Sequence, residues 1–329
     1  MKQAVSDPKT IAAALNQAHH ELMERHDDVV VYGEDVARNG GVFRITDGLL
    51  DAFGSERVMD TPLAEAGIVG TAIGMASFGL RPIVEIQFSG FIYPAMDQIV
   101  SHLSRMRNRS RGQYTCPVVI RAPYTGGIKA PEHHSESPEA FFCHVPGIKV
   151  VTASTPSDAR DMLHRSVEDP DPVLLLEPKE VYRSVKQTLP EEPGESEIGT
   201  AKFVETGEDL TVISWGAMLR TTARVLEDDR TDYSVDLIDL RTLDPFDEEA
   251  IISSVKKTGR AVIVQEAPRN CGLASEIVAL INEKAFLNLE APIKRVTGFD
   301  TIMPLAKTED RYRPGSSRIR RAMKETIEF

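Results

Sequence analysis

The sequence DTPLAEAGIVGTAIG, residues 60–74, decides the fold of this chain. Thr61 is suited to cap the first turn of a helix, and Pro62 would then take the first helical position, where its missing N–H costs nothing. Glu65 falls one residue beyond the position of a capping-box glutamate. Its carboxylate is therefore free for another task.

The same segment carries glycines at helical spacing, at Gly67, Gly70 and Gly74, which leave one side of the helix almost without side chains. Three glycines cost roughly 3 kcal/mol in helix propensity relative to alanine, so a close approach to another backbone is needed to compensate. We expect a subunit interface on this side. Spacing alone also allows a plainer interpretation, a buried helix lined by glycine and alanine with one exposed glutamate.

The composition bounds the class of protein. A length of 329 residues is typical of two domains, and 41% apolar with 27% charged residues is typical of a soluble globular protein. The net charge of −12 argues against nucleic acid as a partner, because binding phosphates requires a basic surface. No apolar run approaches the ~20 residues of a membrane span. The N-terminal segment contains acids and a helical apolar period, unlike a signal or transit peptide, so we expect a cytoplasmic protein.

Short apolar strands alternate with helices along the chain, which predicts parallel sheets covered on both faces. Among these elements we expect strands over 29–32, 148–152 and 210–214 and a helix near 93–109. Residues 1–188 are predicted to form a first α/β domain. Residues 189–208, LPEEPGESEIGTAKFVETGE, are rich in Pro, Gly and Glu and are predicted to be a linker. Residues 209–329 repeat the alternation and are predicted to form a second, smaller α/β domain.

The spacing of Glu65, Gly70 and Gly74 resembles the motif of the pyrimidine-binding half of thiamine-diphosphate enzymes. The longer string DTPLAEAGIVGTAIGMASFGLRPIVEIQF, residues 60–88, is similar to the beta subunit of a 2-oxo acid dehydrogenase, the decarboxylating first component of that complex, of the branched-chain or pyruvate type. VISWGAM, DLRTLDPFD and VIVQEAPRNCG extend the resemblance to the family's transketolase-like C-terminal domain. The resemblance implies an α/β pyrimidine-binding domain followed by a transketolase C-terminal-like α/β domain.

The resemblance also implies roles for single residues. Glu65 would bind the ring nitrogen of the aminopyrimidine and favour the imino tautomer that deprotonates the thiazolium carbon. Leu63 would lie beside that ring, and Phe91 would stack on it, although a core phenylalanine is the plainer interpretation. Glu34 would join an acidic path between cofactor sites.

The segment GGIKAPEHHSESP, residues 126–138, contains adjacent histidines. A zinc site is not expected, because no further ligands stand at metal-binding spacing. His-Ser-x-Ser resembles the family's active-site loop and matches His134, not His133. The implied role is to stabilise the reaction intermediate and to donate a proton during reductive acylation of the lipoyl group. Glu136 is expected to raise the pKa of His134. The plainer alternative is a surface loop with solvated histidines.

A second cofactor motif is missing from the chain. Thiamine enzymes hold magnesium and the diphosphate with Gly-Asp-Gly and a later Asn, and this sequence has no Gly-Asp-Gly. We therefore expect half a cofactor site, with the diphosphate and magnesium held by another chain. The resemblance identifies that chain as an alpha subunit in an α2β2 heterotetramer. The glycine face is where two beta chains, or the alpha and beta chains, are expected to meet. It also implies a second partner, a dihydrolipoyl acyltransferase core that bears lipoyl groups.

The family often binds a structural potassium ion through backbone carbonyls and acids. The matching positions here are Cys116, Val118, Val119, Ser166, Asp169 and Asp171. Because Asp171 replaces the usual Asn and adds charge, sodium, water or no ligand remain alternatives.

The favoured interpretation is a catalytic beta subunit for oxidative decarboxylation of a 2-oxo acid, with a branched-chain substrate preferred. The alternatives are a pyruvate dehydrogenase or acetoin dehydrogenase beta subunit. A different class would be a non-catalytic scaffolding paralogue that keeps only the interface.

Overall fold

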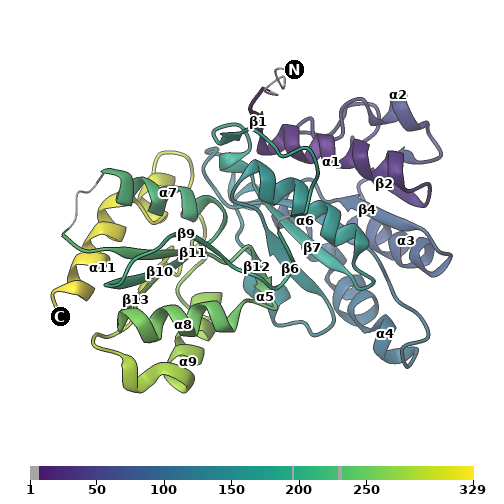
Figure 1. Ribbon diagram of the computed structural model, residues 1–329. Coiled ribbons are helices and arrows are strands. Elements are labelled where there is room, and N and C mark those ends of the chain that lie inside the picture. Colours follow the sequence, from purple (N-terminus) through teal and green to yellow (C-terminus); the bar gives the residue numbers. More distant parts are fainter. Residues whose placement is uncertain (1–6, 195, 229–231) are drawn as a thin grey trace, which may run out of the picture.

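The computed structural model describes residues 7–194, 196–228 and 232–329. Two α/β units lie side by side, the N-terminal one in purple to teal and the C-terminal one in green to yellow (Figure 1). Of the predicted segments, the first six residues and Glu195 of the linker lie outside the described residues. None of the described helices is long and apolar enough to cross a membrane.

The first unit is built on a seven-stranded sheet. Its strands in spatial order are β12 (Thr242–Asp244), β6 (Lys149–Thr152), β7 (Val173–Pro178), β5 (Val119–Tyr124), β4 (Arg81–Glu85), β2 (Val29–Gly33) and β3 (Val58–Asp60). All neighbours are parallel except β12, which pairs antiparallel with β6. The central strands are buried along their whole length, as expected for a parallel sheet covered on both faces.

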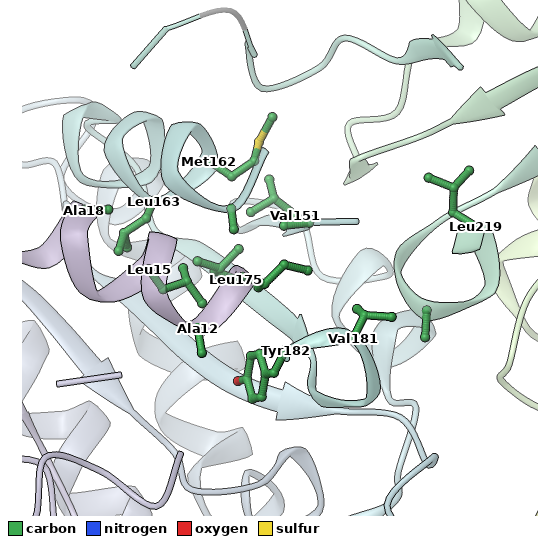
Figure 2. Packing of buried hydrophobic residues seen from close by; sticks show 14 of the residues in the cluster. Ala12, Leu15, Ala18, Val151, Met162, Leu163, Leu175, Val181, Tyr182 and Leu219 are labelled. Atoms are coloured by element: carbon green, nitrogen blue, oxygen red, sulfur yellow. The ribbon is translucent and has the colours of Figure 1, made fainter. Parts of the chain in front are cut away.

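Helices cover both faces of this sheet. On one face α1 (Ile11–Arg25) packs against α6 (Pro156–Glu168), and Figure 2 shows Leu15 and Leu163 from these helices close to Leu175 of β7. Full burial of each such side chain contributes about 1.5–3 kcal/mol. The other face carries α3 (Glu65–Ser77), α5 (Glu139–Cys143) and a broken helical run that ends in α4 (Met106–Arg109).

The remaining pieces of this unit are short. They are α2 (Leu49–Phe53), the two-stranded sheet of β1 (Lys9–Thr10) and β8 (Lys186–Gln187), the 3₁₀ turns Ser89–Phe91, Tyr93–Ala95, Leu103–Arg105, Glu132–His134 and Lys179–Val181, and a π-helical segment Asp97–His102. The run that the sequence predicted as one helix over 93–109 is therefore divided into several short pieces.

The second unit has a five-stranded sheet. Its strands in order are β14 (Lys294–Val296), β13 (Ala261–Val264), β10 (Leu210–Ser214), β11 (Val235–Asp239) and β9 (Lys202–Glu205), the last antiparallel. Its helices are α7 (Gly216–Asp228) and α11 (Ser316–Ile327), which pack together, α8 (Glu248–Thr258) and α9 (Leu273–Ala285), which pack together, the short α10 (Glu309–Tyr312) and a 3₁₀ turn Phe286–Asn288.

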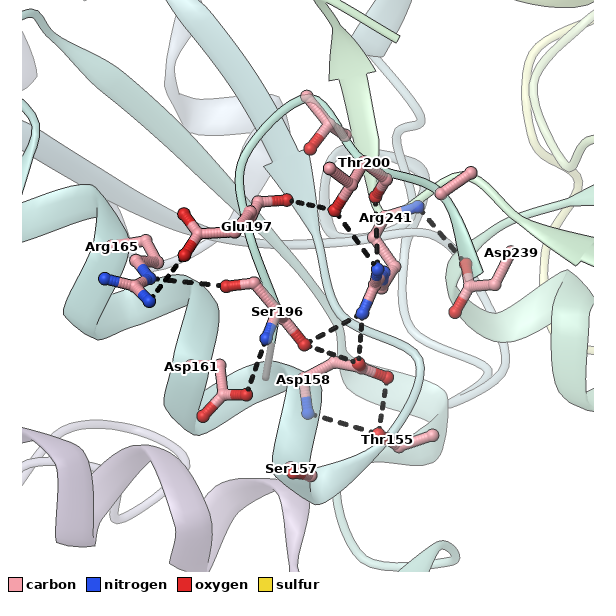
Figure 3. Close-up of polar contacts among 12 residues, drawn as sticks. Thr155, Ser157, Asp158, Asp161, Arg165, Ser196, Glu197, Thr200, Asp239 and Arg241 are labelled. Carbon is pink, nitrogen blue, oxygen red and sulfur yellow. Dashed lines mark hydrogen bonds and ion pairs between the residues drawn. The ribbon is translucent and has the colours of Figure 1, made fainter. Parts of the chain in front are cut away.

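The two units share structure at their boundary. The range 189–208, predicted as a linker, includes β9, which belongs to the second sheet, whereas β12 crosses back to extend the first sheet. Arg241 donates to Asp158 of α6 at 3.2 Å and to Ser196 of the connecting segment at 2.8 Å, and the Ser196 amide donates to Asp161 at 3.1 Å (Figure 3). The connecting segment is thus fixed by buried polar contacts.

Candidate active site

Glu65 is the first residue of α3. The sequence predicted that the helix would begin with Thr61 as its cap and Pro62 at its first position, and this was wrong: Ala64 is the N-cap and makes no side-chain hydrogen bond. The Thr61 amide donates to the carbonyl of Gly33 at 3.0 Å, so the chain beyond β3 continues alongside β2 before the helix starts. The half-buried Glu65 carboxylate therefore lies in the first turn, where the helix dipole favours negative charge.

Glu34 follows β2 at the same edge of the sheet and is 5% exposed. Its Oε1 has no hydrogen-bond partner within the described ranges. Burial raises the pKa of Glu34, and the nearby carboxylates of Glu65 and Asp35 raise it further. The structure thus brings two of the predicted acids, Glu34 and Glu65, close enough for their charges to interact.

His134 lies in a 3₁₀ turn of the loop after β5, against two aromatic rings. Its imidazole is 4.4 Å from the ring of Phe88 and 5.2 Å from that of Phe91, measured between centroids, and both contacts are edge-on. His134 is half-buried whereas His133 is exposed, so the neighbours differ in environment. Phe91 is also half-buried, and Leu63, just before α3, is 82% exposed and free to contact a ligand or another chain.

The expected effect of Glu136 on His134 was wrong. Burial lowers the pKa of His134, and the charges of Lys179 and His133 lower it further. The Glu136 carboxylate instead lies within 3.5 Å of the Tyr93 hydroxyl, and burial raises the pKa of Glu136 itself. The Glu136 carboxylate is thus engaged with Tyr93 and is not among the charges that set the pKa of His134.

The residues proposed for potassium lie at the opposite edge of the sheet, near the start of β5 and β7. Asp169 pairs with Lys149, and Asp171 accepts from Arg107 at 2.6 Å, so both acids have cationic partners within the chain. Cys116 and Asp171 also border a cavity of about 870 Å³ that extends to the second unit.

The other predicted potassium positions are buried, and their backbone groups are engaged. Val118 and Val119 lie at the start of β5; the Val118 amide donates to the carbonyl of Cys116 at 2.8 Å, and the Val118 carbonyl accepts from the Val173 amide at 3.0 Å. The Ser166 hydroxyl donates to the carbonyl of Met162 at 2.6 Å. Among the described residues, no group of three or more His, Cys, Asp or Glu side chains could hold a metal ion.

Sequence reasoning missed a buried ion cluster beneath the site. Arg121 of β5 donates to Glu177 of β7 at 2.7 Å and to Glu85 of β4 at 2.9 Å, and its side chain is fully buried. Burial raises the pKa of Glu85, and Arg121 opposes that effect. A signal was present in the sequence, because Glu85, Arg121 and Glu177 each directly follow a short apolar run in their strands. Adjacent strands with opposite charges predict a buried pair.

Comparisons with known proteins agree with the two-unit fold. Residues 7–185 match the family described as transketolase, pyrimidine binding domain, and residues 199–319 match transketolase, C-terminal domain. A solved split-gene transketolase, described as an inactive beta4 tetramer, superposes with a TM-score of 0.78 over 97% of this chain and 98% of that chain. At 20% identity this similarity concerns the fold alone.

Curated relatives are much closer in sequence. The chain is 50% identical over 311 residues to the pyruvate dehydrogenase E1 component subunit beta of Acholeplasma laidlawii, covering 94% of this chain and 95% of that protein. It is 45% identical over 321 residues to the protein of the same name from Staphylococcus epidermidis, covering 97% and 99%. With the two predicted domain types present in the predicted order, the chain belongs to the beta-subunit family of the thiamine-diphosphate-dependent 2-oxo acid dehydrogenases.

Proposed function

We propose that this chain is the beta subunit of a pyruvate dehydrogenase first component, which decarboxylates pyruvate and transfers the acetyl group to lipoamide on an acyltransferase core. The observation that carries the proposal is the pair of Glu65, at the first turn of α3, and the buried Glu34 beside it. His134 lies at the same edge of the sheet, held by Phe88 and Phe91. Carboxyl ends of parallel strands are the usual place for ligands in such folds.

The residues present fit the aminopyrimidine half of thiamine diphosphate. When bound, this cofactor supplies the thiazolium carbon that attacks the 2-oxo acid. Glu65 would accept a hydrogen bond from the pyrimidine ring, and Leu63 and Phe91 would border that ring. The orphaned Oε1 of Glu34 offers a buried acceptor in the same acidic region. His134 would hold and donate a proton during acyl transfer.

The diphosphate and magnesium need a second chain, since Gly-Asp-Gly is absent from the sequence. The face of α3 that carries Gly67, Gly70 and Gly74 supports this part of the proposal. A Cβ at Gly74 would meet no atom within 4 Å, and one at Gly67 would meet only the Cβ of Ala64 at 3.5 Å, so the face is open at these two positions. At Gly70 a Cβ would lie 3.3 Å from the side chain of Gln98, which covers the face there. At the two ends of the helix, Leu63 is 82% and Phe78 is 92% exposed. An alpha subunit in an α2β2 heterotetramer would cover this apolar surface and hold the diphosphate and magnesium.

Two further features belong to the proposal. The C-terminal domain would bind the lipoyl-bearing acyltransferase core. A potassium ion could bind through carbonyls near Cys116 and Ser166, provided that Asp169 or Asp171 exchanges its cationic partner for the ion.

The substrate is proposed from the names of the relatives. The sequence had favoured a branched-chain 2-oxo acid, but both relatives are pyruvate dehydrogenase subunits, so the pyruvate alternative is better supported. The test is to co-express this chain with an alpha subunit and to measure kcat/KM of the assembled enzyme for pyruvate, 2-oxobutanoate, a branched-chain 2-oxo acid and acetoin. We expect pyruvate to give the highest value. A higher value for a branched-chain acid or acetoin would contradict the substrate, and no turnover by the assembled pair would favour a scaffolding paralogue.

The half-site is tested separately by calorimetry on the isolated chain. Thiamine diphosphate with magnesium should bind negligibly, because the groups that hold the diphosphate belong to the alpha subunit. Micromolar binding to the isolated chain would contradict the shared site while leaving the substrate assignment open.

A further inference from the structure

Lys179 occupies an unusual position beneath the His134 loop. In the pairing of β5 with β7, Tyr124 is opposite Pro178, so Thr125 and Lys179 are the next residues beyond these two neighbouring strands. Lys179 is only 3% exposed, and its Nζ has no hydrogen-bond partner in the part of the chain that the structure describes. Lysines are rarely buried without a partner, because the ammonium loses its hydration. This placement therefore calls for a reason beyond packing.

The acids around Lys179 are engaged elsewhere. The amide of Gly126 donates to Glu266 Oε1 at 2.5 Å, and the amide of Gly127 donates to Glu309. Arg313 donates to the other oxygen of Glu266 at 2.9 Å. These acids come from the C-terminal domain, so they fix the base of the His134 loop instead of binding the ammonium.

Arg313 also pairs with Glu180, the neighbour of Lys179, at 3.1 Å. This guanidinium thus binds the nearest acid on the turn that carries Lys179. Two further buried atoms near Lys179, Thr125 Oγ1 and Glu309 Oε2, have no hydrogen-bond partner within the ranges described. The ammonium charge is consequently not neutralised by a direct ion pair.

The loop above Lys179 is held in one arrangement. The Thr125 amide donates to the carbonyl of Glu136 at 2.9 Å and joins the two ends of the loop. The Ser89 hydroxyl donates to the same carbonyl at 3.0 Å. A Cβ at Gly90 would lie 2.1 Å from the carbonyl oxygen of His133, so only glycine allows the loop to approach this closely. The loop that carries His134 thus begins and ends at Thr125, which follows β5 where Lys179 follows β7.

Burial and three neighbouring charged groups change the pKa of His134. Burial lowers the pKa of His134, Lys179 and His133 lower it further, and Glu132 raises it. Burial lowers the pKa of Lys179 to about 7, and Arg313 adds to this effect. The acids Glu266, Glu309 and Glu180 oppose it by raising the pKa. Lys179 therefore gains its charge as the pH falls below about 7, the range in which an imidazole would take up a proton.

We propose that Lys179 is a positioning residue for His134, and that its buried ammonium, lying beneath the loop without a direct counter-ion, keeps the imidazole neutral. A neutral imidazole offers one N–H donor, and any proton that it takes up is released readily to the next acceptor. The consequence for catalysis rests on the proposed function, in which His134 donates a proton during acyl transfer. The electrostatic effect itself does not depend on that function.

The test is an NMR titration of the full-length chain labelled with ¹³C-histidine, with the His134 signal assigned by its loss in His134→Gln. In the wild-type chain we expect a pKa below the ordinary value of ~6.5. Lys179→Met keeps the length of the side chain and removes its charge, and should move the His134 pKa upward by about half a unit or more. The matched control is Lys129→Met, which removes an exposed lysine from the same loop and should leave His134 unchanged.

A wild-type pKa at or above the ordinary value would overturn the proposal without any Lys179 variant. An unchanged His134 titration in a folded Lys179→Met chain would also overturn it. Should Lys179→Met not fold, as judged by circular dichroism, Lys179→Gln is the second neutral variant, and an unchanged His134 titration in that variant would overturn the proposal.

The assembled enzyme provides a readout that a purely structural role would not move. Because a proton donor acts in its protonated form, the alkaline limb of the pH profile for acyl transfer to a lipoyl domain should shift to higher pH in Lys179→Met, in parallel with the NMR titration. A shifted titration without a shifted profile would support the electrostatic effect of Lys179 and contradict the role of His134 in the proposed function. The two failures are therefore distinguishable.

Discussion

The imidazole of His134 meets the ring of Phe88 edge-on, with 4.4 Å between the ring centroids and 65° between the ring planes. This contact fixes one of two adjacent histidines at the carboxyl edge of the sheet, while the other is exposed. The two histidines have the same side chain, so the difference in environment is what favours His134 over His133 for the proposed role.

Replacing His134 with alanine should impair acyl transfer to the lipoyl domain more than decarboxylation measured with an artificial electron acceptor. The reason is that the proposed proton transfer belongs to the acylation step. His133→Ala is the matched control and should affect neither rate, since this residue is exposed. A transfer defect in His133→Ala together with normal transfer in His134→Ala would reverse the assignment.

Replacing Glu65 with glutamine should reduce decarboxylation by a factor on the order of 10²–10⁴, the usual worth of a positioned acid–base group. Folding and assembly should be unaffected, because the amide is isosteric and the residue is only half-buried. Steady-state kinetics of the assembled enzyme measures the loss, with the exposed Glu56→Gln as the control. Unchanged turnover would remove Glu65 from the mechanism.

Substitutions at Gly74, on the glycine face of α3, should affect the stability of the isolated chain and its assembly with a partner in different ways. Gly74→Ala should raise the free energy of unfolding of the isolated chain by up to about 1 kcal/mol, since alanine favours helix and the new Cβ meets no atom within 4 Å. Gly74→Leu should also fold, but should prevent a close approach by another chain. Urea unfolding and light scattering measure the two effects.

The control for this prediction is Glu24→Leu, on the exposed side of α1. It should assemble with the alpha subunit normally. Full assembly of Gly74→Leu would show that this face of α3 is not the subunit interface.

Asp239 should make stability depend on pH. Burial and the nearby Asp158 raise the pKa of Asp239 from 3.8 to about 7 in the folded chain. A raised folded pKa means that the stabilising contribution is complete below the unfolded pKa of ~3.9. It is lost as the pH rises through about 7. Asp239→Asn should therefore reduce the fall in the free energy of unfolding between pH 5 and pH 8, measured by urea titration.

The control for this prediction is Asp209, whose pKa is shifted in the opposite direction. Hydrogen bonds from the amide and hydroxyl of Ser234 lower the pKa of Asp209, so its contribution is lost as the pH falls. Asp209→Asn should leave the change between pH 5 and pH 8 as in the wild-type chain. If Asp239→Asn behaves in the same way, the buried carboxyl does not titrate as expected.

The sequence by itself determined the alternation of strands and helices, because each strand is a short apolar run and each helix has its own period. The predicted strands over 29–32, 148–152 and 210–214 correspond to β2, β6 and β10 within one residue. The motif around Glu65 also identified the family, since it is a local pattern that needs no knowledge of distant contacts.

The tertiary structure decided the features that depend on neighbours far away in the chain. The start of α3 moved from Thr61 to Glu65 because the Thr61 amide binds Gly33 of another strand. The pKa of His134 is lowered, not raised, because burial disfavours the charged imidazole and Lys179, which follows β7, lowers the pKa further. Local sequence sets propensity and pattern, but burial and charge at a residue depend on segments brought together only by folding, so these properties could not be predicted from sequence spacing.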